Sequence, residues 1–142
     1  MKLASNSLQF ILNVTKTQSL LHRRFDGGLG GLGLSEFMIL YYLACAPDKK
    51  LRRIDLAGKV GLTASGVTRL LLPMEKIGLV KKETNPNDAR VSFVMLAPGG
   101  KTKLEEGLER AELLTAEIIP DNKKKRIDDL STVLTELVGT IV

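Results

Sequence analysis

Three side chains that can hydrogen-bond to the edges of DNA bases lie close together in the chain: Ser65, Thr68 and Arg69. Arginine donates two parallel hydrogen bonds to a guanine edge, and hydroxyl groups can contact any of the bases. The apolar residues around them recur every three or four positions, which predicts one buried helix face: Val67, Leu70, Leu71, Met74 and Ile77. The polar trio and Leu72 then occupy the outward face, near the start of this helix.

Asp88 and Arg90 are a second pair of candidate DNA contacts. Residues 85–88 are dense in turn-forming types, and segments 79–84 and 91–96 on either side predict a β-hairpin. At the hairpin tip the carboxylate can orient the guanidinium, which can then enter a narrow minor groove, where the negative potential is strongest. The alternative is a surface ion pair that contributes little to stability.

The elements that would position these side chains form a helix-turn-helix. Residues 56–60 predict a short helix that ends at Gly61, and Thr63 offers a side-chain oxygen that caps the second helix. Gly78 ends that second helix, and the hairpin follows at once. The order helix, turn, capped helix and hairpin is typical of a winged helix-turn-helix. A generic buried helix is the alternative, and the distribution of charge argues against it.

Positive charge gathers on this same segment. The chain carries a net charge of +5, whereas residues 49–90 hold ten basic and four acidic residues and the remainder is close to neutral. Arg52 and Arg53 stand where a capping Ser, Thr or Asp is usual, so they oppose the helix dipole, and a bound phosphate would offset that effect. Lys81 and Lys82 lie on the first hairpin strand, where a cation meets phosphate. This distribution is the electrostatic footprint of a nucleic-acid binder.

Helices are predicted on both sides of this segment. Leu3, Phe10, Val14 and Leu21 recur near heptad spacing and predict a long helix that faces a partner helix, and the glycine-rich stretch 26–33 ends it. A second helix spans about 34–46, and two more follow the hairpin at about 101–119 and from about 124 onward. The last has a clear apolar face: Ile127, Leu130, Leu134, Leu137, Val138 and Ile141. A subunit interface explains such terminal helices more simply than a separate core.

Over residues 51–97 the sequence resembles the MarR family of dimeric bacterial transcription regulators. The resemblance rests on these matches: Leu56-Ala57, Gly61-Leu62-Thr63, Val67-Thr68-Arg69-Leu70, residues 75–80 and Asp88-Ala89-Arg90. It implies a mainly α fold with a small β-hairpin wing, in which 1–142 is one domain, 34–97 the DNA-binding lobe, and 1–33 and 98–142 dimerisation helices. It also implies a homodimer that binds a palindromic operator. In the family, a small ligand or cysteine oxidation commonly releases the dimer from the DNA.

Motif and resemblance together give one expected set of DNA-binding residues: Arg52, Arg53, Thr63, Ser65, Gly66, Thr68, Arg69, Lys81, Lys82, Asp88 and Arg90. In the family, a ligand crevice lies where the dimer helices meet the DNA-binding lobe. The resemblance therefore implies a small-molecule effector near four residues: His22, Phe25, Met38 and Tyr41. Lys123–Arg126 is a basic run that we interpret as a solvated face rather than a phosphate clamp.

Three residues need separate expectations. Ala97 stands where the family usually has threonine, so the next helix loses a side-chain cap and is expected to start late. Pro73 inside the second helix removes a backbone donor to the Arg69 carbonyl and is expected to bend the axis. Cys45, the single cysteine, has no adjacent cation to lower its pKa, so we expect a semi-buried structural thiol rather than a redox sensor.

These observations favour a sequence-specific regulator of transcription, a repressor or an activator, that binds duplex DNA. An enzyme is disfavoured because one histidine and one cysteine form no plausible catalytic or metal constellation, and no cofactor or metal is expected. The alternative is a winged-helix module that binds protein or RNA without reading bases. No apolar run is long enough to span a bilayer and the N-terminal stretch is unlike a secretory signal, so a cytoplasmic location is expected.

Overall fold

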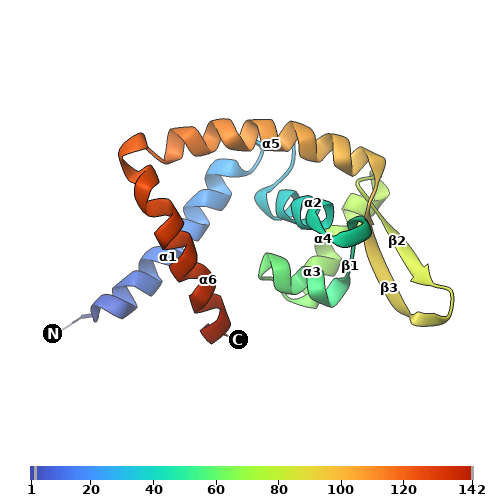
Figure 1. The fold of residues 1–142 in the computed structure, drawn as a ribbon, viewed down its shortest axis with the longest axis horizontal. Coiled ribbons are helices and arrows are strands. Elements are labelled where there is room, and N and C mark those ends of the chain that lie inside the picture. Colours follow the sequence, from blue (N-terminus) through green and yellow to red (C-terminus); the bar gives the residue numbers. More distant parts are fainter. Residues whose placement is uncertain (2, 142) are drawn as a thin grey trace. The chain divides into compact units, whose positions relative to one another are not determined.

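The computed structural model describes all residues except 2 and 142. It contains two compact units, Met1–Ala111 and Glu112–Val142, and the first holds every strand of the described chain (Figure 1). The fold is mainly helical with a small antiparallel sheet, as the sequence predicts. Over the described residues, no helix combines the length and the hydropathy needed to cross a membrane.

Two helices open the first unit: α1 (Asn6–Phe25) and α2 (Leu34–Cys45). The Ser5 hydroxyl accepts a hydrogen bond from the Leu8 amide at 3.1 Å and caps α1. Glycines with positive φ carry the chain through the predicted break, and the Asp26 carboxylate accepts from the Leu34 amide at 2.9 Å to start α2. The predicted break and restart are therefore confirmed.

A winged-helix lobe follows, which is built from three helical elements and three strands. In chain order these elements are η1 (Pro47–Lys49), β1 (Lys50–Arg52), α3 (Arg53–Val60), α4 (Ala64–Lys76), β2 (Val80–Asn85) and β3 (Asp88–Leu96). The sheet order is β1-β3-β2, and both pairings are antiparallel. The sequence predicts the hairpin but not β1, because three residues with one apolar side chain give no alternation to recognise.

The core of the lobe is formed by apolar side chains of α2, α3, α4 and the sheet. Its fully buried members include Ile39, Leu40, Leu43, Leu56, Val67 and Met74. The predicted stripe of α4 is confirmed at Val67, Leu71 and Met74. It is wrong at Ile77, whose side chain is 69% exposed, because α4 ends at Lys76 and Ile77 leaves the helical direction as its C-cap.

The first unit closes with the start of α5 (Pro98–Ile118), which begins directly after Ala97. The expected late start is therefore wrong. Ala97 donates from its amide to the Leu79 carbonyl at 3.1 Å and accepts from the Lys101 amide at 3.0 Å, so backbone contacts fix the first turn without a side-chain cap. Proline at this position suits a helix start, since the amide it lacks would have no helical partner.

The second unit comprises the end of α5, a short η2 (Asp121–Lys123) and α6 (Lys124–Ile141). An ion pair of 2.9 Å joins Asp121 to Lys124 at the start of α6. The predicted apolar face of α6 is largely exposed: Leu130, Leu134, Val138 and Ile141 have exposed side chains, and Ile127 and Leu137 are half-buried.

Candidate nucleic-acid interface

The N-terminal turn of α4 is built by its cap. Gly61, in the left-handed conformation at φ 71°, ends α3. Thr63 then accepts a hydrogen bond at its Oγ1 from the Gly66 amide at 3.0 Å, as predicted, and the Ser65 hydroxyl lies 3.2 Å from the same oxygen. A Cβ on Gly66 would stand 3.1 Å from Thr63 Oγ1, so glycine leaves room for this cap. The helix start is fixed before any ligand arrives.

Beyond the cap, Ser65 and Arg69 are exposed on the outward face of α4. Thr68 is half-buried, and its hydroxyl donates to the Ala64 carbonyl at 2.9 Å, which leaves its lone pairs to accept. Within the described part of the chain, the Arg69 guanidinium has no ion pair or side-chain hydrogen bond. Arg69 therefore has its full set of donors available for a ligand.

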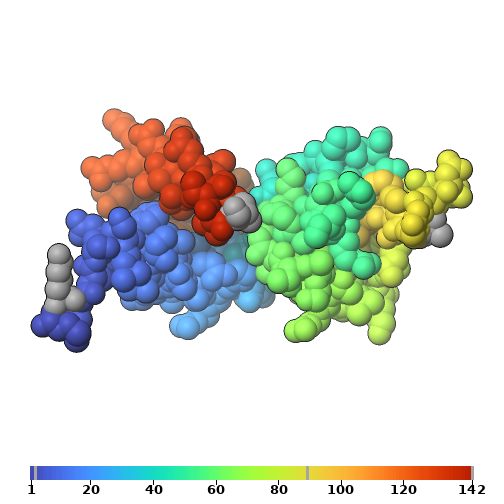
Figure 2. Space-filling view, turned by 90° about the horizontal axis from the view of Figure 1, so that it is seen from below, coloured from blue at the N-terminus to red at the C-terminus, as the bar shows by residue number. Residues whose placement is uncertain are grey.

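The tip of the wing holds the second predicted pair. The Asp88 Oδ1 atom accepts from the Arg90 amide at 3.0 Å and from the Arg90 Nε at 3.2 Å. These hydrogen bonds from Arg90 lower the pKa of the Asp88 carboxyl. The Arg90 side chain remains 92% exposed. The contact is confirmed, and it orients a cation that faces solvent. In Figure 2 the wing, in yellow, projects beside α3 and α4, in green.

Lys81 and Lys82 are both exposed, but they do not share a side of the sheet. Successive residues of a strand point to opposite faces. Lys82 pairs with Val94, whereas Lys81 pairs with Met95 and lines a cavity beside the start of α5. Both lysines are expected DNA contacts from the sequence, whereas the structure gives them different surroundings.

Sequence reasoning missed an ion pair at the base of the wing. Lys50 Nζ on β1 lies 2.8 Å from Glu83 Oε1 on β2 and 4.9 Å from the ring centroid of Phe93 on β3. The hydrogen bond that the Lys50 ammonium donates to Glu83 raises the pKa of Lys50. The pair crosses all three strands and so ties the wing to the lobe. No local pattern could have revealed it, since the partners lie 33 residues apart.

Arg52 and Arg53 begin α3, and the structure gives each a different environment. Arg52 is the N-cap residue, and its Nε lies 3.4 Å from Asp55 Oδ2 in the first turn of the helix. This carboxylate offsets part of the unfavourable interaction between Arg52 and the helix dipole, and the exposed guanidinium can still meet a phosphate. Arg53 is half-buried, and its Nε is buried without a hydrogen-bond partner among the described residues.

The residues implied for a ligand crevice lie at the end of α1 (His22 and Phe25) and along α2 (Met38 and Tyr41). Tyr41 stacks on Phe37 with ring centroids 6.5 Å apart and meets the edge of Tyr42 at 5.4 Å. None of the four implied residues lines the cavity of about 600 Å³ beside α5. Their role in ligand binding stays a prediction.

Cys45 corrects another expectation, because it is exposed rather than semi-buried. It occupies the last position of α2, one turn beyond Tyr41. The neighbouring Cys45 raises the pKa of the Tyr41 hydroxyl, first through its charge and then through a hydrogen bond. Its apolar sequence neighbours suggested burial, and Leu43 and Ala46 are indeed buried, but Cys45 itself lies on the solvent side of the helix end.

A capped second helix followed by a wing defines this chain as a winged-helix protein. Comparison with known families agrees with this class: residues 32–92 match the model of the MarR family. The match runs from the loop before α2 to the middle of β3.

Individual relatives agree with this match. The HTH-type transcriptional repressor YetL of Bacillus subtilis (strain 168) is 29% identical over 106 residues, which cover 73% of this chain and 64% of YetL. The chain thus matches slightly less than two thirds of the length of that relative.

Two solved structures from Streptomyces coelicolor have a similar fold. Sco3205, a MarR family transcriptional regulator in complex with DNA, has a TM-score of 0.75 at 21% identity, with 96% of this chain and 90% of that chain covered. The PcaV transcriptional regulator in complex with its natural ligand has a TM-score of 0.77 at 16% identity, with 96% and 98% covered. At these identities the likeness shows the fold.

Proposed function

We propose that the protein regulates transcription by binding duplex DNA, with α4 in the major groove and the wing in the flanking minor groove. The observation that carries this proposal is the juxtaposition, in one lobe, of Arg69 and Arg90. Both guanidinium groups are exposed, and each extends from an element whose geometry is fixed by its own hydrogen bonds. Preset donors of this kind suit a bidentate contact to a guanine edge and insertion into a narrow groove.

The comparisons support the same proposal. YetL is named as a transcriptional repressor, and Sco3205 was solved in complex with DNA. The net charge of this chain is +5, and its cations concentrate in the lobe that matches the family. Within the proposal, Thr63, Ser65, Gly66 and Thr68 shape the base-reading turn, while Lys82 and the Arg52–Arg53 pair face phosphates.

We further propose that the protein acts as a homodimer. In the described chain α1 has no buried residue, and it exposes Leu8, Ile11 and Leu12. Helix α6 also has none, and it exposes Leu130, Leu134 and Val138. Apolar faces of this extent are normally covered by a partner, most simply by a second copy of the same chain. Two copies would present their α4 helices to palindromic half-sites about 34–36 Å apart.

We also propose that a small molecule releases the protein from DNA. It is supported by the PcaV structure, which holds that regulator's natural ligand. The residues implied by the family resemblance are His22, Phe25, Met38 and Tyr41, all of which are at least partly exposed in the single chain. A ligand that contacts both α1 and α2 would act on the joint between the proposed dimer helices and the lobe.

A mobility-shift assay with salt titration tests the proposed function. Genomic fragments protected by the protein supply the specific duplex, and a shuffled duplex and an RNA of equal length supply the comparison. The proposal predicts specific affinity that exceeds shuffled affinity by about 10³-fold or more, and a steep loss of affinity with salt. Equal affinity for both duplexes, or tighter binding to RNA, would instead support an interaction module that does not read bases.

A further inference from the structure

The ion pair between Lys50 and Glu83 joins two strands that are not neighbours in the sheet. The strand order is β1-β3-β2, so the contact of 2.8 Å between Lys50 Nζ and Glu83 Oε1 spans the middle strand. Lys50 pairs in register with Met95, and Glu83 pairs with Phe93. Residues paired across strands, and residues two apart in one strand, share a face of the sheet. The lysine therefore reaches diagonally across β3 to its partner on one face.

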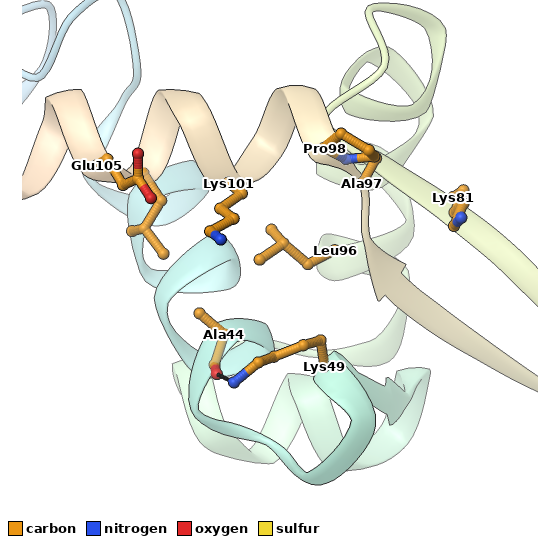
Figure 3. A pocket seen from close by; sticks show the side chains of 9 residues that line it. Ala44, Lys49, Lys81, Leu96, Ala97, Pro98, Lys101 and Glu105 are labelled. Atoms are coloured by element: carbon orange, nitrogen blue, oxygen red, sulfur yellow. Dashed lines mark hydrogen bonds between the residues drawn. The ribbon is translucent and has the colours of Figure 1, made fainter.

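The surroundings of this ion pair strengthen it relative to a pair in open solvent. The side chains of Lys50 and Glu83 are only 27% and 40% exposed. Lys50 Nζ also lies 4.9 Å from the centroid of the Phe93 ring, which attracts the ammonium and shields one side of it from water. Another cation of β2, Lys81, lies beside the cavity next to α5 (Figure 3). Partial burial and two partners for one ammonium distinguish this contact from an ordinary surface pair.

The ladder of the wing becomes irregular just beyond this contact. It is regular up to the pair of Thr84 with Ser92, and its register shifts at the next step. Residues 89–91 of β3 are extra at this bulge, and Arg90 is among them. The rung that contains Glu83 lies one residue before the shift. Because a bulge bends its strand, the direction in which Arg90 extends depends on the last regular rungs before it.

We propose that Lys50 and Glu83 are positioning residues, whose ion pair holds the wing against the lobe and so sets where Arg90 meets DNA. Strand β1 leads directly into α3, so Lys50 is anchored to the helix-turn-helix, whereas Glu83 belongs to the wing. The pair fixes the spacing between Arg69 on α4 and Arg90 on the wing, and this spacing must match the distance between two grooves of the duplex. This inference rests on the proposed function.

A purely electrostatic role gives the opposite expectation for one of the two partners. Glu83 adds a negative charge to a lobe that faces phosphates, so Glu83→Gln would strengthen DNA binding if charge alone mattered. Positioning predicts instead that Glu83→Gln weakens binding to the protected genomic duplex by about three- to tenfold. Lys50→Met should weaken it by a similar or larger factor, and Lys50→Arg, which keeps the charge, should retain most of the affinity.

Double-mutant cycles with Arg90 separate positioning from a general effect on stability. In the wild type, Arg90→Ala should weaken specific binding by about tenfold. In the Glu83→Gln and Lys50→Met backgrounds the same substitution should cost less than about threefold, because a wing that is not held no longer directs Arg90 into its groove. The cost of Arg69→Ala should be equal in all backgrounds. Glu75→Gln is the matched control, since it removes one exposed carboxylate from the same lobe and should leave the cost of Arg90→Ala unchanged.

Hydrogen exchange of the DNA-free protein supplies a readout that does not depend on the proposed function. Amides of β2 and β3 should exchange at least about threefold faster in Glu83→Gln and Lys50→Met than in the wild type, while those of α4 stay protected and show that the variants are folded.

Several outcomes would overturn the proposal: unchanged exchange in the wing, equally faster exchange in α4, additive losses with Arg90→Ala, or tighter specific binding by Glu83→Gln. Equal affinity of the wild type for specific and shuffled duplexes would contradict the proposed function itself. The exchange rates would then still decide whether the Lys50–Glu83 pair holds the wing.

Discussion

Asp88 holds Arg90 at the tip of the wing through two hydrogen bonds to one oxygen, from the Arg90 amide at 3.0 Å and from Nε at 3.2 Å. The carboxylate thereby fixes both the backbone and the side chain of a guanidinium that is otherwise exposed. An oriented cation loses less entropy when it enters a groove than a freely rotating one, so the pair would favour the proposed entry of the wing into a minor groove.

The first prediction concerns the titration of Asp88. Its pKa is lowered from the ordinary value of 3.8 by Arg90, so the pair should persist at neutral pH and be lost only as the pH falls through the lowered pKa. Carbon NMR of the Asp88 carboxyl should show a midpoint below 3.8 in the wild type. In Arg90→Met the midpoint should move back towards 3.8. Identical midpoints in the two proteins would show that the pair does not form in solution.

The second prediction concerns the cap of α4. Thr63→Ala removes the acceptor for the Gly66 amide and should lower the free energy of unfolding by about 1 kcal/mol. Thr63→Ser keeps the oxygen and should restore most of that loss. Urea unfolding of the three proteins measures the difference. An alanine variant as stable as the serine variant would mean that the cap contributes nothing.

The third prediction compares the effects of alanine substitution at two glycines on stability. A Cβ on Gly100 would collide with the Leu79 carbonyl, so Gly100→Ala should destabilise the protein by about 1–3 kcal/mol. Gly58 lies in α3 with open space around it, so Gly58→Ala should stabilise by about 0.5–1 kcal/mol through its higher helix propensity. Thermal and urea unfolding should therefore give changes of opposite sign, and changes of the same sign would contradict the packing at the start of α5.

The fourth prediction tests the proposed homodimer. Leu134 lies on the exposed apolar face of α6 at 45% exposure, so Leu134→Lys should place a charge in the interface and shift the population to monomer. Thr132→Lys adds the same charge to the opposite face of the helix and should leave the dimer intact. Sedimentation velocity separates the two species. A monomeric wild type, or equal dissociation of both variants, would rule out this face as the interface.

Sequence reasoning recovered the parts of the lobe that are specified locally. Gly61, Thr63 and the turn before Asp88 act within a few residues, and all three behave as predicted. The errors arise where distant residues decide the outcome. Ile77 has the right spacing for the core but falls one residue beyond α4, and α5 starts at Pro98 because Leu79 supplies the backbone contact.

In the candidate site, too, contacts between nearby residues could be predicted and contacts between distant residues could not. The Asp88–Arg90 contact could be predicted because it joins residues two apart, whereas the Lys50–Glu83 pair depends on the order of strands in the sheet. The different surroundings of Lys81 and Lys82 required knowledge of where α5 packs, and the cavity beside Lys101 could not be foreseen from any single segment. Contacts between residues close in the chain can be predicted from the sequence. Surfaces formed by several distant elements depend on how those elements pack.

The central claim is that Arg69 reads a base while Lys82 meets phosphate, and binding of both alanine variants to specific and random duplexes across several salt concentrations tests it most directly. Arg69→Ala should weaken binding to the specific duplex by about 1–3 kcal/mol and leave random binding much less affected. Lys82→Ala should weaken binding to both duplexes alike and reduce the salt slope by about one. If Arg69→Ala lowers specific and random binding by the same factor, the outward face of α4 does not read the sequence of the DNA.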